Sequence, residues 1–169
     1  MKIKNPVPVF ILLSFLALTS CSRREYPLGV QDASALNQLA LEIQQYASAL
    51  RDTAKASNDP AQKDALYELL RKADFNFIQI GHLFDIITIE LSHARDNQVS
   101  PGAMSIVSSG MLDAQVAVMK GLINENIRLA EAAADGALKD EYAKAGELYK
   151  KVLNEMERLR NKFAQAQAK

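Results

Sequence analysis

The chain is poor in the side chains that most protein chemistry requires. Its 169 residues include one cysteine, two histidines and no tryptophan. A single cysteine excludes an internal disulfide, a cluster of thiolate ligands and the Cys-x-x-Cys-His attachment motif of c-type haem. Lysine plus arginine and aspartate plus glutamate balance at 20 each, so the charge gives no sign of a nucleic-acid-binding surface.

The sequence also lacks a recognisable catalytic constellation. Its serines have no plausibly placed base, its carboxylate pairs follow the spacing of a helix surface, and no glycine-rich loop sits between a strand and a helix. No alternation of apolar and polar residues predicts a strand. We therefore expect a helical protein that is not an enzyme and that holds no cofactor.

The chain does contain an apolar leader close to its first residue. Two lysines precede an apolar stretch over residues 7–18, and small residues follow it. This order is typical of a secretory signal peptide, and the stretch is shorter than the about 20 apolar residues of a membrane span. The leader ends in the motif Leu18-Thr19-Ser20-Cys21. This motif resembles the lipobox of bacterial lipoproteins.

The resemblance to bacterial lipoproteins implies an anchor and an address. In that family the cysteine of the motif, here Cys21, receives diacylglycerol, and the residues before it are removed. Three acyl chains such as palmitate bury far more methylene groups than a single myristoyl chain, so release from the bilayer would be negligible. Ser22 stands where lipoproteins retained in the inner membrane often carry Asp, so the resemblance implies the periplasmic side of the outer membrane. The alternative is an uncleaved anchor helix with an incidental cysteine.

The expected domain organisation follows from this leader. Residues 1–20 are the signal peptide, residues 21–33 a lipidated tether, and residues 34–169 the folded domain. Without the leader the formal charge is −2, because the leader holds two of the basic residues and none of the acidic ones. At about 3.3–3.6 Å per residue, the tether beyond Cys21 spans on the order of 40 Å at most.

Helical periodicity runs through residues 34–169. Apolar residues recur three and four apart in four segments of about 24 to 38 residues, separated by short polar breaks. Steps of three and four residues form the 3.5-residue repeat of coiled coils, which lets helices pack at shallow angles along their length. Four such segments with short connections predict an all-α, elongated, antiparallel up-down-up-down four-helix bundle.

The helix starts differ in how clearly the sequence marks them. Asp59-Pro60-Ala61-Gln62 combines an N-cap, a proline at the first helical position and a capping-box partner. The third helix has no comparable start, because the serines and glycines of residues 99–110 are poor helix formers. We expect this stretch to be partly unwound, with the regular helix beginning near Ser109. Close backbone approach through the small residues is the alternative.

The second helical segment carries apolar residues on two faces. Its heptad stripe lies on one side, and a second set of apolar residues and both histidines lies on the other: Phe75, Ile78, His82, Ile86, Ile89 and His93. A helix that is apolar on two faces is buried on both, or offers one to a partner. We interpret the second set as a docking or self-association surface for a protein partner. The alternative is that the first helix covers it.

The two histidines also have to be weighed as metal ligands. Glu90-Leu91-Ser92-His93 has the Glu-x-x-His form of di-iron bundles, but such sites need a second copy and further glutamates from two other helices. His82 and His93 are about 16 Å apart along a straight helix, too far to share an ion. We expect no metal site. The alternative function is a bundle that holds a metal, a b-type haem or an apolar small molecule near His82, Glu90 and His93.

Two amides fall within the apolar stripe of the third segment. Gln115 and Asn126 would each cost about 1–3 kcal/mol if buried without partners, so we expect them to be paired and to set the bundle register. The sequence as a whole predicts a lipid-anchored bundle that binds a protein partner, as an accessory subunit of an envelope, secretion or conjugation assembly. Surface exclusion or immunity against phage or conjugation differs from this prediction in the partner alone.

Overall fold

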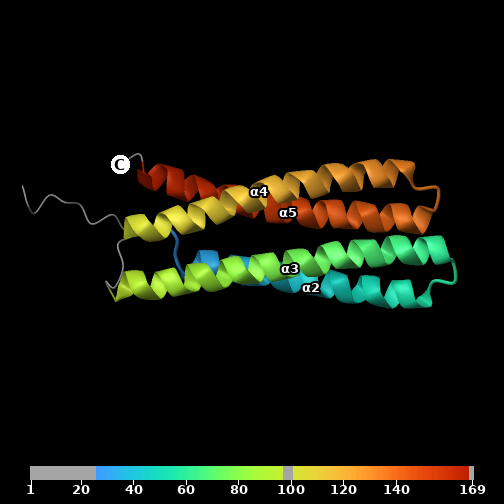
Figure 1. Cartoon of the computed structure of the whole chain (residues 1–169), viewed down its shortest axis with the longest axis horizontal. Coiled ribbons are helices and arrows are strands. Elements are labelled where there is room, and N and C mark those ends of the chain that lie inside the picture. The colour runs from blue at the N-terminus through green and yellow to red at the C-terminus, as the bar shows by residue number, and fades with distance from the viewer. Residues whose placement is uncertain (1–25, 97–100, 168–169) are drawn as a thin grey trace, which may run out of the picture.

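The computed structural model describes residues 26–96 and 101–167. These residues form four α-helices and no strand: α2 (Val30–Ala56), α3 (Pro60–Arg95), α4 (Pro101–Ala132) and α5 (Gly136–Gln167). Successive helices run antiparallel along the full length of an elongated bundle (Figure 1). The predicted all-α, up-down-up-down bundle is thereby confirmed. None of the four helices combines the length and the hydrophobicity that a membrane span requires.

The bundle consists of two helical hairpins. Helix α2 packs along α3, and α4 packs along α5, with closer backbone approach within each hairpin than between the two (Figure 1). The heptad stripes of all four helices meet in one core. Its largest fully buried side chains are Leu36, Ile43, Leu50, Leu66, Leu69, Ile80, Leu83, Ile87, Leu112, Met119, Tyr149 and Phe163. Each such side chain stabilises the fold by about 1.5–3 kcal/mol through its removal from water.

Short capped turns close the hairpins at one end of the bundle. Asp59 Oδ1 accepts a hydrogen bond from Ala61 N at 2.9 Å, so the predicted N-cap of α3 is present. Gln62 does not complete a capping box. Its Nε2 instead donates to Asp135 Oδ2 at 2.8 Å, and Asp135 also caps α5 through Ala137 N at 2.7 Å. The Gln62 side chain thus ties the two hairpin turns together across the end of the bundle.

The start of the folded domain lies earlier than predicted. Helix α2 begins at Val30, four residues before the predicted boundary at residue 34, and Tyr26 and Leu28 ahead of it are buried. Asp32 explains the early start, because its Oδ2 accepts a hydrogen bond from Gly29 N at 2.8 Å in the first turn. The expected tether of residues 21–33 therefore extends too far at its C-terminal end, because residues 30–33 belong to helix α2. Residues 21–25 lie outside the described part of the chain.

The start of α4 also differs from the prediction. The helix begins at Pro101 and not near Ser109. Low helix propensity is a weak constraint when tertiary contacts compensate it. Here Ser108 is fully buried, and its hydroxyl lies 2.9 Å from the hydroxyl of the first described residue, Tyr26, on the other side of the bundle. Ser108 is thus a poor helix former in isolation, but it makes a tertiary contact in this fold.

Candidate functional site

The outer side of α3 is apolar and exposed, and it carries the residues predicted to bind a partner. Phe75, Ile78 and Ile89 are 51%, 49% and 53% exposed. His82 is exposed with them, whereas Ile86 and His93 are half-buried. Helix α2 does not cover this side, so the alternative that it would do so is wrong. Single exposed apolar residues are ordinary on protein surfaces, whereas large contiguous exposed apolar patches are typical of interaction sites.

Exposed valines on α4 lie close in the sequence to its polar contacts with α3. Gln115 Nε2 donates to Gln79 Oε1 at 3.2 Å, and Val118 follows Gln115 by about one turn of α4. Val118 is 37% exposed. At the other end, the Ser108 hydroxyl donates to Glu90, next to Ile89 in the chain. Val107 precedes Ser108 and is 53% exposed.

We refer to this combined surface as the α3–α4 face. It comprises Phe75, Ile78, His82, Ile86, Ile89, Val107 and Val118. Val107 and Val118 were not predicted from the sequence to belong to this surface. Their position outside the heptad stripe of the third segment indicated that they would be exposed, but nothing in that segment showed which side would adjoin α3.

Glu90 is engaged in buried hydrogen bonds, whereas His82 is exposed and His93 half-buried. Glu90 is buried, and its Oε2 accepts hydrogen bonds from the hydroxyls of Tyr26 and Ser108. Within residues 26–96 and 101–167, no group of three or more histidine, cysteine, aspartate and glutamate side chains is placed to hold a metal ion. The two ends of the Glu-x-x-His motif thus lie in different surroundings. Glu90 makes a buried contact, and His93 is half-buried.

Tyr26 joins the start of the described chain to three helices. Its hydroxyl contacts Glu90 on α3 and Ser108 on α4, and its ring meets the Phe163 ring of α5 edge-on, with centroids 5.9 Å apart. Burial raises the pKa of the Tyr26 phenol, and the adjacent Glu90 carboxylate raises it further, so the hydroxyl keeps its proton and remains a donor. Sequence reasoning placed Tyr26 in the tether and missed this contact.

A second polar contact fastens the first turn of α2 to α5. Asp32 is 3% exposed, and its carboxylate binds Lys162 Nζ and Arg158 Nη2, the latter at 2.7 Å from Oδ1. Burial alone would raise the pKa of Asp32. The hydrogen bonds from Lys162, the Gly29 N–H and Arg158 outweigh burial and lower the pKa of this carboxyl below its usual range. Asp32 is therefore a charged anchor between the ends of the folded chain.

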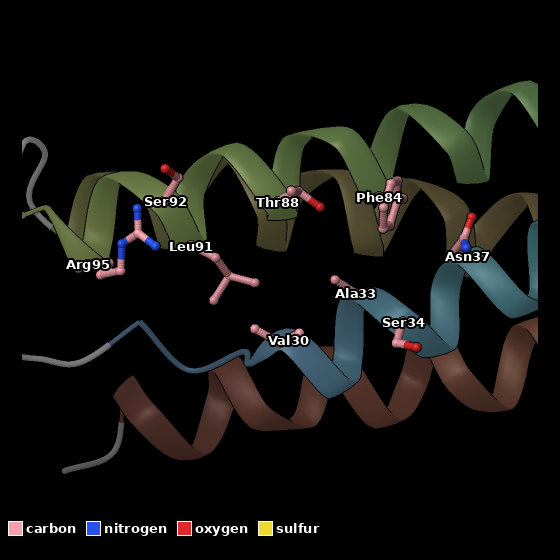
Figure 2. Close-up of a pocket in the computed structure, with 9 residues that line it drawn as sticks. All are labelled: Val30, Ala33, Ser34, Asn37, Phe84, Thr88, Leu91, Ser92 and Arg95. Atoms are coloured by element: carbon pink, nitrogen blue, oxygen red, sulfur yellow. The ribbon is translucent and has the colours of Figure 1, made fainter.

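An apolar groove lies on the opposite flank of α3, against the first turns of α2. It measures about 510 Å³ and is lined by Val30, Ala33, Ser34, Asn37, Phe84, Thr88, Leu91, Ser92 and Arg95. Figure 2 shows Leu91 projecting from α3 toward Val30 and Ala33 on α2, with Arg95 at one end and Asn37 at the other. The groove does not include His82, Glu90 or His93, around which the alternative ligand site was predicted.

The buried amides behave differently from one another. Gln115 is paired with Gln79 through its Nε2, as expected, but its Oε1 has no hydrogen-bond partner among the described residues. Asn126 is 1% exposed, yet neither its Nδ2 nor its Oδ1 has a hydrogen-bond partner among the described residues, so the expectation of a paired amide is wrong there. Tyr149 is likewise fully buried, and burial raises its pKa to about 12, partly offset by the neighbouring Asn76 side chain.

Comparison with known proteins leaves the function to be argued from these residues. No family model, no curated protein and no solved structure matches the chain. The lipobox-like motif and Cys21 lie outside the described residues, so lipidation remains a prediction from the sequence. The described residues themselves provide an exposed apolar face, an apolar groove, and two buried polar contacts that hold the beginning of the described chain in place.

Proposed function

We propose that this protein is a lipid-anchored envelope protein whose helical bundle binds a protein partner through the α3–α4 face. The anchor is Cys21, and the bundle faces the periplasm from the outer membrane. The proposal assigns no enzymatic activity. The observation that carries it is the exposure of about half of each of Phe75, Ile78 and Ile89 in one row on a helix whose other side is fully packed.

The α3–α4 face has the spacing of a helix-binding surface. Phe75, Ile78, His82, Ile86 and Ile89 follow one another in steps of three and four residues, which is the pattern that accepts a helix by knobs-into-holes packing. Phe75 supplies the large aromatic side chain that commonly contributes most to binding at such a surface. A partner with an apolar helical stripe would bury this row and complete it as a second small core.

The short connection to Cys21 supports a role close to the bilayer. Cys21 and Tyr26 are five positions apart, and at about 3.3–3.6 Å per position this connection spans about 18 Å at most. This is less than half of the reach expected for a tether ending at residue 33. Because Tyr26 is held by Glu90 and Ser108, the end of the bundle that carries it stays next to the membrane. Confinement to a surface raises the effective concentration of the face for partners in the same membrane.

The test is capture of partners by the lipidated full-length protein from native membranes. The double variant Ile78→Asp, Ile89→Asp places two charges in the α3–α4 face, and it should lose the partner that the wild type captures. Ile127→Asp is the matched control, because Ile127 is 46% exposed on α4 and lies outside the face. Retention of the same partner by the double variant, or its equal loss in Ile127→Asp, would contradict the proposal.

The identity of the captured protein also decides between the biological roles. A component of an envelope, secretion or conjugation assembly indicates an accessory subunit. A component brought in by phage or by a donor cell indicates exclusion or immunity. Both roles use the same anchor and the same face.

A further inference from the structure

We propose that the groove between α2 and α3 binds one of the acyl chains attached to Cys21. This inference rests on the lipidation that forms part of the proposed function, and it assigns that lipid a binding site on the protein itself. The occupant is an acyl chain covalently linked to this polypeptide, and not a free lipid taken from the bilayer.

The shape and lining of the groove suit a linear apolar chain. Val30 and Ala33 form one wall, and Phe84 and Leu91 form the other, with the two helices running alongside (Figure 2). Its volume of about 510 Å³ lies within the range of roughly 300–1,000 Å³ found for small-molecule sites. Arg95 stands at one end of the groove and Asn37 at the other, and the small hydroxyl residues Ser34, Thr88 and Ser92 line it between them.

The position of the groove matches the place where the lipid begins. The chain that leads into α2 enters from the Arg95 end of the groove (Figure 2). Tyr26 is held by Glu90, which directly precedes the groove residue Leu91, and by Ser108, and Cys21 can lie no more than about 18 Å from Tyr26. A chain attached to Cys21 would enter at the Arg95 end and run toward Asn37. Tethering makes this an intramolecular event with a high effective concentration.

Energetics decide when the site is filled. A chain that moves from the bilayer into the groove exchanges one apolar surrounding for another, so tethering and fit alone favour the groove. A chain that is exposed to water gains the full benefit of burial. We therefore expect partial occupancy in membranes, where docking turns the α2–α3 side of the bundle toward the bilayer, and high occupancy when the protein is away from a membrane.

The experiment uses a photoactivatable fatty acid that cells incorporate into the lipidated full-length protein. The fatty acid carries a diazirine near the end of its chain, and the protein is irradiated in membranes and after transfer to a detergent-free solution. The expected result is an intramolecular cross-link within tryptic peptide 73–95, mapped by fragmentation to residues 84–95. The yield should be higher in solution than in membranes.

Thr88→Trp fills the groove, because Thr88 lines it and is exposed, so the change does not disturb the core. This variant should lose the cross-link. Thr53→Trp is the matched control, since Thr53 is exposed on α2 away from the groove, and it should retain the cross-link.

The outcomes separate this inference from the proposed function. An intact mass with fatty acids, but with cross-links confined to bilayer lipids or unchanged in Thr88→Trp, overturns the groove and leaves the anchor standing. An intact mass without fatty acids overturns the lipidation itself, and the groove assignment with it. Capture of a partner through the α3–α4 face is read independently of both results.

Discussion

Lys162 Nζ lies 2.7 Å from Asp32 Oδ1 and 2.8 Å from Asp32 Oδ2, so the last helix of the bundle holds the first turn of the first described helix. The two residues are 130 positions apart in the chain. Arg158 joins the same carboxylate from one turn away. This ion pair and the Tyr26 contact with Glu90 close the fold at the end of the bundle where the described chain begins.

Asp32 should make the stability of the protein depend on acid pH. Its pKa is lowered in the folded state, so its contribution is fully present above the unfolded value of about 3.9 and is lost as pH falls through the folded value. At pH 7, Asp32→Asn should lower the free energy of unfolding by about 2 kcal/mol, the scale of a hydrogen bond to a charged group. The difference should shrink as the pH falls below about 3.9. Urea unfolding at several pH values measures both effects, with the exposed Asp52→Asn as the control.

Tyr26→Phe should loosen the start of the domain. The change removes one of the two hydroxyls that hydrogen-bond the buried Glu90 carboxylate, at a cost of about 1–3 kcal/mol. We expect a lower urea midpoint and faster proteolytic cleavage ahead of α2. Tyr67→Phe alters a half-buried tyrosine elsewhere on α3 and serves as the control. Equal stability of Tyr26→Phe and the wild type would show that Ser108 alone satisfies Glu90.

Asn126→Leu should leave stability unchanged or raise it by about 1–2 kcal/mol. The native amide is buried with both polar atoms unpaired, and leucine has a similar volume without the desolvation cost. Gln115→Leu should gain less, because it also removes the hydrogen bond to Gln79. Thermal unfolding of the two variants compares them directly. A marked loss of stability in Asn126→Leu would indicate that ordered water hydrogen-bonds this amide.

The α3–α4 face should tolerate charges without loss of the fold. Ile78→Asp and Ile89→Asp should each change the free energy of unfolding by no more than about 0.5 kcal/mol, as expected for exposed positions. Ile80→Asp, two positions from Ile78 but fully buried, should unfold the domain. Circular dichroism and urea unfolding distinguish these results. Unfolding of Ile78→Asp would show that this side of α3 is part of the core.

The candidate site was partly visible in the sequence. The six residues on the outer side of α3 could be grouped from helical spacing alone, because residues three and four apart share a face whatever surrounds the helix. Their exposure could not be read in the same way. It depends on which side of α3 the neighbouring helices occupy, and the same applies to the share of the face contributed by Val107 and Val118.

The number of helices, their order and their antiparallel course follow from the amino-acid sequence, because heptad spacing and an N-cap such as Asp59 act within a few residues. The early start of α2, the helical course of α4 from Pro101 and the groove beside Val30 were decided by the tertiary structure. Tyr26 and Glu90 are 64 positions apart, and Asp32 and Lys162 are 130 apart. Such contacts exist only once the helices have packed, since no local pattern encodes which distant side chain will satisfy a buried charge.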